Sequence, residues 1–291
     1  MTVAVDIGGT KIAAARIEGA RVLERRSAPS PMHGDYARIP QVVAELCGDW
    51  LEHDRRMGIA SAGLIERDRI VLVSREGRPS LALGAAIEQQ FGLTPVILND
   101  AWAGALGEYT HGQHPPCETF AYVTVSTGIG AGFVHKGQLL TSGNGLMAHL
   151  GHSSVSPGNG AAILCACGRT GCLETFASGT AVERLGSALL GAPHTAAELC
   201  VLAHSHSQVA ALLDRAAAAL VEGLLNARAM LGVDCAVVGG SLGRAPAFFS
   251  RLEQHMAGIA APWRLPLFPA RLSADAELFG AALAAESSIH P

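Results

Sequence analysis

Charged side chains are scarce in this 291-residue sequence: Asp, Glu, Lys and Arg together make up only 16% of the residues, and the net charge is −4. No polybasic stretch is present, which argues against nucleic acid or anionic lipid as a partner. No apolar run approaches the length of a membrane span, and the N-terminus lacks the basic region of a secretory signal. We therefore expect a cytoplasmic protein with no nucleic-acid partner and no membrane partner.

The Walker motif of P-loop nucleotide-binding proteins is missing as well, which argues against a P-loop fold. Hydrophobic residues make up 49% of the chain, which is typical of a well-buried globular protein. A chain of this length is expected to form two domains. The proline-containing run HGQHPPCE (111–118) predicts the boundary, with one domain over residues 1–118 and the other over 119–273.

Three of the seven cysteines gather with a histidine between His149 and Glu174, in a segment that otherwise has the composition of a loop. One imidazole and three thiolates form the ligand set of a closed tetrahedral zinc site, and the glycines among them allow sharp turns. The predicted zinc ligands are His152, Cys165, Cys167 and Cys172. Because protein would fill all four positions, we expect this zinc to be structural.

The alternative for this segment is three free thiols beside an unrelated histidine. A disulfide is disfavoured, because Cys165 and Cys167 are too close to bridge comfortably. The remaining cysteines are scattered among apolar residues, where we expect free buried thiols. They are Cys47, Cys117, Cys200 and Cys235.

A strand, a glycine turn and a returning strand occur twice. Thr2–Ile7 alternates as a strand, the turn DIGGTK follows, and Lys11–Ile17 returns. Phe120–Val125, the run STGIGAG (126–132) and Phe133–Leu140 repeat the pattern. Backbone N–H groups at such turns can hold phosphate oxygens, although GGTK alone fits any hairpin equally well. Two copies suggest duplicated halves that clamp a nucleotide.

The predicted nucleotide site includes Asp6, whose carboxylate at a strand end is placed to hold Mg²⁺ through water. Gly240 follows the expected strand Cys235–Val238, and its backbone could pass close to adenine or ribose; a tight turn explains it nearly as well. The residues assigned to the nucleotide are Ala4, Val5, Asp6, Ile7, Gly8, Gly9, Thr10, Lys11, Thr127, Gly128, Ile129, Gly130, Ala131, Gly132 and Gly240.

The short strand Pro95–Leu98 delivers Asn99 and Asp100 at its carboxyl end, just before the expected helix Ala101–Tyr109. Ligands of α/β proteins bind at the carboxyl ends of strands, so Asp100 is the candidate catalytic base. The alternative is that Asp100 only caps the helix. Further helices are expected at 36–52, 83–91, 179–190, 208–231 and 274–285, and further strands at 21–26, 58–61 and 70–73. The histidines at 194, 204 and 206 fit a loop better than a second metal site.

The runs GLMAHLGH (145–152) and CACGRTGCLE (165–174) resemble the signature of the ROK family of sugar kinases and repressors, and the resemblance extends from Val3 to about Ala285. It implies a two-domain actin-like ATPase (ribonuclease H-like) α/β fold with the active site in the interdomain cleft. It also implies that the C-terminal helix (274–291) packs back on the first domain. The resemblance also implies ATP as a substrate and a homodimer, in addition to the Mg²⁺ and structural Zn²⁺ predicted above from the residues.

The resemblance assigns Asp100 to the 6-hydroxyl of the sugar. The residues that it implies in sugar binding are Ser61, Gly63, Asn99, Asp100, His149, His152 and Glu174. His149 stands where many members carry glutamate, and in this it is similar to the bacterial N-acetylmannosamine kinases of the family. The run SREGRP (74–79) lacks the asparagine with which many members touch the sugar.

The implied activity is ATP-dependent phosphorylation of N-acetylmannosamine, an amino sugar, to its 6-phosphate in sialic acid catabolism. A family hexokinase for glucose or another hexose is the first alternative. The second, of another class, is a non-catalytic sugar-sensing regulator. Repressors of the family carry an N-terminal helix-turn-helix domain, and here the first glycine turn begins at residue 8, so we expect an enzyme.

Overall fold

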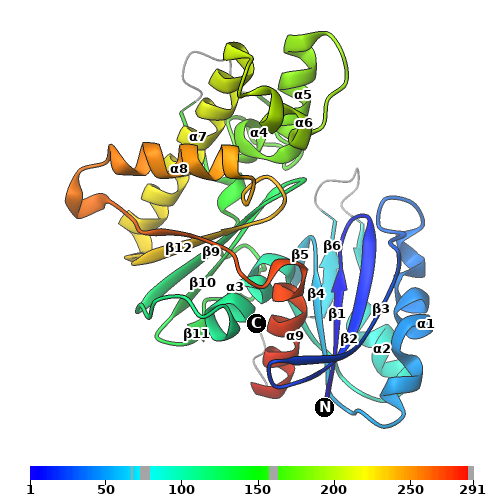
Figure 1. Ribbon diagram of the computed structural model, residues 1–291. Helices are drawn as coiled ribbons and strands as arrows, with labels where there is room; N and C mark the ends of the chain where they lie inside the picture. Colours follow the sequence, from blue (N-terminus) through cyan, green and yellow to red (C-terminus); the bar gives the residue numbers. More distant parts are fainter. Residues whose placement is uncertain (67, 73–78, 157–162, 288–291) are drawn as a thin grey trace. The chain divides into compact units, whose positions relative to one another are not determined.

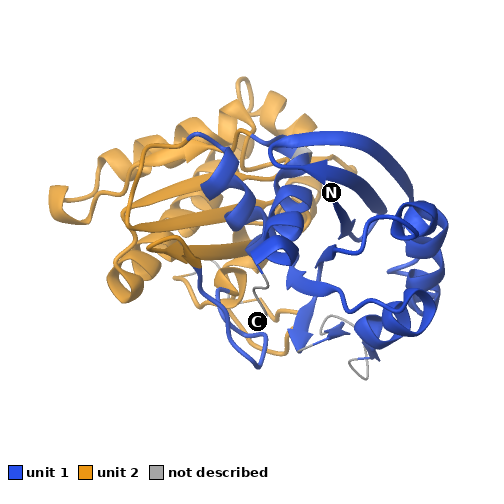
Figure 2. Ribbon diagram, turned by 90° about the horizontal axis from the view of Figure 1, so that it is seen from below, with its two compact units in different colours: residues 1–113, 139–148, 272–291 blue, residues 114–138, 149–271 orange. Residues whose placement is uncertain are grey.

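The computed structural model describes residues 1–66, 68–72, 79–156 and 163–287. The chain forms two compact units (Figure 2). Unit 1 comprises Met1–Gln113, Leu139–Ala148 and Leu272–Pro291, and unit 2 comprises His114–Gln138 and His149–Arg271. Each unit has its own sheet with helices packed on it, which confirms the predicted α/β class. No helix in the described part of the chain is long and apolar enough to span a bilayer.

The sheet of unit 1 has the strand order β3-β2-β1-β4-β8 (Figure 1). Its strands are β1 (Thr2–Ile7), β2 (Lys11–Glu18), β3 (Arg21–Pro29), β4 (Met57–Ser61) and β8 (Val96–Asn99). The hairpin strands β1, β2 and β3 are antiparallel, whereas β1, β4 and β8 run parallel. Parallel strands are covered on both faces, which explains why β1 and β4 are apolar nearly throughout.

Helices cover this sheet, and unit 1 also contains a small second sheet. The helical elements of unit 1 are η1 (Tyr36–Arg38), α1 (Ile39–Leu51), α2 (Leu83–Phe91), α3 (Asp100–His111), η4 (Ser273–Asp275) and α9 (Ala276–Ser287). The small antiparallel sheet consists of β5 (Leu64–Glu66), β6 (Arg69–Val71) and β7 (Ser80–Leu81). Val3, Val5 and Ile59 pack with α1 in one core. Side chains alternate along a strand, so Gly58 faces the other side, against Ala281 of α9.

Helices α3 and α9 approach each other closely because both carry glycine at the contact. A Cβ on Gly107 would lie 2.1 Å from the Ala276 carbonyl oxygen, and one on Gly280 would lie 1.7 Å from that of Ala103. No side chain fits at either position. This contact fixes α3, which begins at Asp100, against the C-terminal helix.

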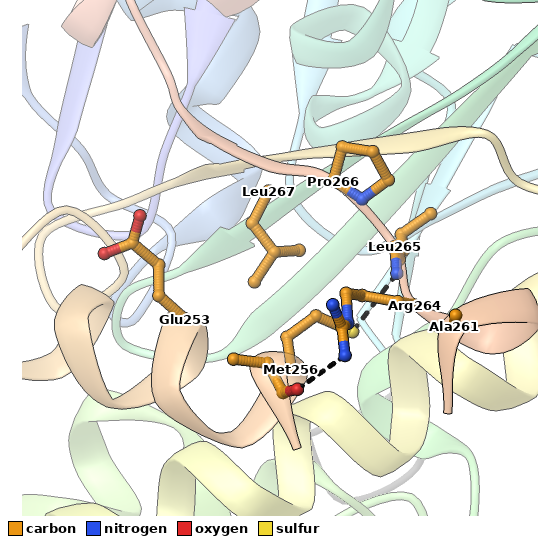
Figure 3. A pocket seen from close by; sticks show the side chains of 8 residues that line it. Glu253, Met256, Ala261, Arg264, Leu265, Pro266 and Leu267 are labelled. Carbon is orange, nitrogen blue, oxygen red and sulfur yellow. Dashed lines mark hydrogen bonds between the residues drawn. The ribbon is translucent and has the colours of Figure 1, made fainter. Parts of the chain in front are cut away.

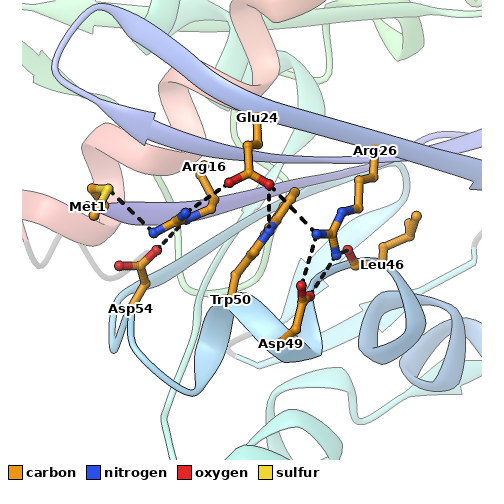
Figure 4. Close-up of polar contacts among 8 residues, drawn as sticks. All are labelled: Met1, Arg16, Glu24, Arg26, Leu46, Asp49, Trp50 and Asp54. Atoms are coloured by element: carbon orange, nitrogen blue, oxygen red, sulfur yellow. Dashed lines mark hydrogen bonds and ion pairs between the residues drawn. The ribbon is translucent and has the colours of Figure 1, made fainter.

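A network of charged side chains holds α1 to strands β2 and β3 (Figure 4). Arg16 donates to Asp54 at 2.8 Å, and Arg26 donates to Asp49 at 2.6 Å. The Arg26 guanidinium also lies 4.3 Å from the Trp50 ring centroid, a cation–π contact. The Arg16–Asp54 pair is largely buried, whereas the exposed Arg26–Asp49 pair is of a kind that contributes about 0–1 kcal/mol. We therefore regard the network as a structural feature of α1.

The sheet of unit 2 has the order β11-β10-β9-β12-β13. Its strands are β9 (Thr119–Val125), β10 (Ile129–His135), β11 (Gln138–Leu139), β12 (Cys235–Gly239) and β13 (Leu267–Pro269). The helical elements are η2 (Leu150–His152), α4 (Glu174–Ala177), α5 (Gly179–Leu190), α6 (Ala196–Leu202), α7 (Ser207–Leu231), α8 (Pro246–Ala257) and η3 (Ala261–Trp263).

The predicted repeat is confirmed: β1/β2 and β9/β10 are antiparallel hairpins, each with a parallel strand beside its first member. The extent of the second turn was predicted wrongly. The run 126–132 was expected to be a loop, but β10 begins at Ile129, so only 126–128 turn. Cross-strand pairing with β9 outweighs the poor strand propensity of Gly130 and Gly132. Helices α6 and α8 and strand β13 were not anticipated.

Candidate functional site

In unit 1, three parallel strands end at one edge of the sheet. Ile7 pairs with Ser61, and Ser61 pairs with Asn99, so the carboxyl ends of β1, β4 and β8 lie side by side. Gly8 and Asp100 directly follow β1 and β8, and Gly63 lies two residues after the end of β4. The structure therefore brings together the predicted unit 1 residues at the place where α/β sheets bind ligands.

The first glycine turn is tight. The Gly8 N–H donates to the Lys11 carbonyl at 3.0 Å. A Cβ on Gly9 would lie 2.9 Å from His33 Nε2, so a larger residue would displace that ring. Thr10 and Lys11 are exposed and available to a ligand. The residues before the turn, Ala4, Val5 and Ile7, are fully buried, so this strand presents its turn and the Asp6 carboxylate.

Asn99, and not Asp100, is the N-cap of α3. The Asn99 Oδ1 accepts from the Ala101 N–H at 3.0 Å, while its Nδ2 donates to the Gly63 carbonyl at 3.1 Å. The alternative prediction that Asp100 caps a helix starting at Ala101 is therefore wrong: the helix already begins at Asp100. Asp100 Oδ1 does accept from the Ala101 N–H at 2.8 Å, which orients the carboxylate.

Carboxyl groups from distant parts of unit 1 influence one another here. Burial and the nearby Asp100 charge raise the pKa of Asp6 to about 7. Burial, then the charges of Asp6, Asp100 and Glu108, raise the pKa of Glu277 to about 8. This concentration of negative charge favours a cation. Glu108 and Glu277 were not predicted from the sequence; the available signal was that each is an acidic residue at a position where the neighbouring helix residues are mostly apolar.

In unit 2, the second glycine turn is surrounded by two other loops. The Gly179 N–H, at the start of α5, donates to the Ser126 carbonyl at 2.7 Å. Ser126 Oγ lies 3.2 Å from Ser241 Oγ. Gly240 has a φ of 80°, and a Cβ there would lie 2.3 Å from the Val125 carbonyl oxygen. The predicted nucleotide residue Gly128 thus lies in this turn, and Gly240 lies against it. Their backbone N–H groups are suited to bind an anion.

Glu174 is attached to this turn. Its Oε2 accepts from the Ile129 N–H at 2.9 Å. A Cβ on Gly128 would lie only 2.6 Å from the same oxygen, so glycine at 128 makes room for the carboxylate. The sequence could not reveal this contact, because Ile129 and Glu174 are separated by 45 positions.

We expect Gly128→Ala to displace the Glu174 carboxylate and to lower the free energy of unfolding by about 1–2 kcal/mol, because the charge-assisted hydrogen bond to Ile129 is lost. Denaturant unfolding of the variant measures this change. Gly143→Ala is the matched control, since a Cβ there meets nothing within 4 Å. Equal stability of the two variants would contradict the role assigned to Gly128.

The predicted zinc ligands converge in unit 2. Ligand atoms of His152, Cys165, Cys167 and Cys172 all lie within 4.8 Å of one another. Cys165 Sγ is 3.6 Å from His152 Nδ1, and Cys167 Sγ is 3.7 Å from Cys172 Sγ. Bond lengths of about 2.0–2.3 Å around tetrahedral zinc place neighbouring ligand atoms about 3.5–3.8 Å apart. The donor set and its spacing therefore fit zinc, and the backbone already holds the ligands near that geometry.

The backbone around this cluster is fixed to the rest of unit 2. A Cβ on Gly151 would lie 2.3 Å from the Ile129 carbonyl oxygen, so η2 packs directly on β10. The Arg169 guanidinium donates to the His152 carbonyl at 2.8 Å. The rings of His149 and His152 are stacked, with centroids 6.0 Å apart. Because His152 directs Nδ1 at the thiols, its Nε2 remains for another contact.

Two of the remaining histidines singled out in the sequence bond to the helix backbone, and part of the run 74–79 lies outside the described residues. Nδ1 of His206 accepts from the Val209 N–H and caps α7, while Nδ1 of His204 lies 3.0 Å from the Val201 carbonyl oxygen. Within residues 1–66, 68–72, 79–156 and 163–287, one group of His, Cys, Asp or Glu side chains is close enough to share a metal ion, and it consists of His152, Cys165, Cys167 and Cys172. The run 74–79, which lacks the asparagine that many family members carry, has its residues 74–78 outside the described part of the chain.

An open pocket of about 350 Å³ lies in unit 2 between α8 and the segment leading to β13 (Figure 3). Arg264 closes part of it by donating to the Ala257 carbonyl at 2.8 Å. Glu253, Met256 and Leu267 line it, and none of its lining residues is among the predicted site residues. We therefore do not assign the candidate site to this pocket.

Comparison with known proteins connects this arrangement to one family. The model of the ROK family matches residues 2–287. The chain is 33% identical to an N-acetylmannosamine kinase of Escherichia fergusonii over 289 residues, which cover 98% of each chain.

Solved structures of the same family share the fold. A ROK hexokinase from Thermus thermophilus superimposes with a TM-score of 0.80 and 31% identity over 99% of this chain and 98% of that one. A ROK family glucokinase from Streptomyces griseus, in complex with glucose and AMPPNP, gives 0.82 and 27% over 98% and 99%. These similarities confirm the expected two-sheet actin-like ATPase fold.

Proposed function

Because the chain belongs to the ROK family, we propose that it transfers the γ-phosphoryl group of ATP to the 6-hydroxyl of N-acetylmannosamine. The observation that carries this proposal is the strand edge of unit 1, where the ends of β1, β4 and β8 align and present Asp6 and Asp100. Phosphoryl transfer to a hydroxyl needs a base for the proton and positive charge beside the phosphates. Of two carboxylates at one edge, one can act as the base, and the other can hold the Mg²⁺ ion that supplies the positive charge.

Asp100 is the proposed base. Its carboxylate is oriented by the Ala101 N–H, and the Asn99 side chain links the start of α3, through the same N–H, to the Gly63 carbonyl. As the 6-oxygen attacks the γ-phosphorus, the hydroxyl proton passes to Asp100, the bond to the β-phosphate oxygen breaks and ADP leaves. Asp100 then returns the proton to solvent.

Asp6 is the proposed holder of Mg²⁺, through a water molecule. Bound there, the ion would offset the charge of the β- and γ-phosphates. A pKa of about 7 means that the ion must displace a proton from part of the Asp6 population. The two glycine turns, with Thr10 and Lys11 of the first, Thr127 and Gly128 of the second, and Gly240, would receive the phosphates and the nucleoside.

The proposed sugar contacts are Ser61, Gly63, Asn99, His149, His152 and Glu174. Glu174 would accept from sugar hydroxyls, and its attachment to Ile129 keeps it rigid for that purpose. His149 can donate as well as accept a hydrogen bond, which suits the carbonyl of a 2-acetamido group better than glutamate would. Nε2 of His152 would face the sugar while Nδ1 faces the metal.

We also propose that the Cys₃His cluster binds one structural zinc ion and that the product enters sialic acid catabolism as N-acetylmannosamine 6-phosphate. The position of Glu174, two residues after Cys172, connects metal and sugar sites. Zinc would supply no chemistry to the transferred group, because its four positions are filled by the protein.

N-acetylmannosamine should be preferred over glucose by at least roughly tenfold in kcat/KM. Glucose would leave the partner of the amide unsatisfied, at about 1–3 kcal/mol for each missing hydrogen bond. A coupled ADP assay over N-acetylmannosamine, N-acetylglucosamine, mannose, glucose and fructose measures the preference. Equal or greater efficiency on glucose or fructose favours a family hexokinase; no ADP release with any sugar favours a sensor.

We propose a homodimer formed through helices of unit 2. Leu189 of α5 and Val201 of α6 are 41% and 71% exposed, and these two helices pack together. Light scattering should give about twice the chain mass of 30.0 kDa. Val201→Glu should shift the mass towards the monomer, whereas Met230→Glu, a similarly exposed residue at the end of α7, should not. A monomer mass for the unaltered protein contradicts the assignment.

A further inference from the structure

Two cysteines outside the metal cluster lie against each other in unit 2. Cys117 Sγ is 2.8 Å from Cys235 Sγ, although the residues are 118 positions apart. Cys117 is half-buried in the segment that enters β9, and Cys235 is the buried first residue of β12. Both thiols are free. The expectation of free thiols agrees with this, but Cys117 is half-buried and not buried, and the contact between the two sulfurs was not predicted.

The backbone on both sides of this pair is fixed. Oδ2 of Asp234 accepts from the Glu118 N–H at 3.1 Å and from the Thr119 N–H at 2.9 Å. The Asp234 N–H donates to the Thr119 carbonyl at 2.9 Å, and Cys235 pairs with Phe120 in the parallel β9–β12 ladder. The two sulfurs are thus held together by sheet register, so bond formation requires little movement of the chain.

The other cysteines differ from this pair. Cys47 Sγ donates to the Val43 carbonyl within α1 at 3.0 Å. Cys200 is buried in α6, and among the described residues no sulfur partner is recorded for it. Cys165, Cys167 and Cys172 belong to the proposed zinc site. Only Cys117 combines partial solvent access with a neighbouring thiol outside that site.

We propose that Cys117 and Cys235 form a reversible disulfide, which makes the start of unit 2 a redox-sensitive modification site. With a small disulfide as oxidant, the Cys117 thiolate attacks one of its sulfurs and releases one thiol. The Cys235 thiolate then attacks Cys117 Sγ of the mixed disulfide and releases the second thiol. Two protein protons are lost, one disulfide is reduced and one is formed.

The bond would add a covalent link between two segments that are already joined by hydrogen bonds of the sheet. Cys117 lies three residues beyond His114, where unit 2 begins, and β12 ends at Gly239 beside the glycine turn of β9 and β10. Burial raises the pKa of the Cys117 thiol, and burial followed by the contact with Cys117 raises the pKa of Cys235. Below these pKa values the thiolate fraction, and with it the reaction rate, rises about tenfold per pH unit.

The test is oxidation of the zinc-loaded full chain with oxidised glutathione at several pH values, followed by alkylation and tryptic mapping without reductant. The tryptic peptides that carry Cys117 and Cys235 contain no other cysteine, so their cross-link is unambiguous. We expect the cross-link in most molecules, faster formation as pH rises, and full reversal by a thiol reductant. Cys117→Ser should abolish it, and Cys200→Ser should leave it unchanged.

Two results would overturn the proposal. One is the persistence of only a glutathione adduct on Cys117, which would show that Cys235 cannot reach it. The other is a cross-link that forms in urea but not in the folded protein. If Cys235→Ser fails to fold, the half-buried Cys117→Ser variant still decides the question, because its side chain is not part of the core.

Discussion

Asp100→Asn should lower kcat by roughly 10²–10⁴, the range expected when a positioned base is removed, while binding of ATP and sugar stays measurable. Asparagine preserves the size of the side chain and the oxygen that accepts from the Ala101 N–H at 2.8 Å, so the fold of α3 is retained. The carboxylate that takes the hydroxyl proton is lost. Steady-state ADP release and equilibrium binding of each substrate separate the two effects.

Asp54→Asn is the matched control for this variant. Asp54 is a buried carboxylate of the same unit, but it pairs with Arg16 in the network that holds α1. Its replacement should lower the melting temperature and leave kcat within a few-fold, about threefold, of the parent. If Asp100→Asn also stays within that range, Asp100 is not the base, and the strand-edge geometry must serve binding alone.

Cys167→Ser should lose the metal and most of the activity together. Serine is a poor zinc ligand, and the remaining three ligands cannot close a tetrahedral site. The segment 163–174 would then lose the restraint that the metal adds to its hydrogen bonds, and the Glu174 carboxylate would be less well positioned. Elemental analysis should find about one zinc per chain in the parent and little in the variant, with a lower melting temperature for the variant.

Cys200→Ser is the control for the general cost of replacing a buried cysteine in unit 2. It should retain zinc and activity, because Cys200 lies in α6 and not in the cluster. Chelation of the parent should reproduce the effect of Cys167→Ser, and added zinc should restore it. A metal-free parent with full activity and unchanged melting would contradict a structural zinc ion.

Local sequence determined the features whose parts are close in the chain. The convergence of His152 with the three cysteines could be predicted because all four residues fall within one glycine-containing segment, and their residue types favour a metal site. The two hairpins followed from alternating apolar residues around glycines, and α5 and α7 from helical periodicity up to Gly232, whose φ of 67° ends α7. The position of Asp100 directly after a strand was predicted because an apolar strand pattern ends just before Asn99.

Tertiary structure alone decided which distant residues meet. Nothing in the sequence around Glu277 places it near Asp6, yet burial and then the Asp6 charge raise the pKa of Glu277, while burial and then the Asp100 charge raise the pKa of Asp6. The attachment of Glu174 to Ile129 and the contact of Cys117 with Cys235 are of the same kind. Composition and periodicity report how a segment is buried, whereas the partner that it meets is set by strand register and by glycine-mediated helix packing between segments far apart in the chain.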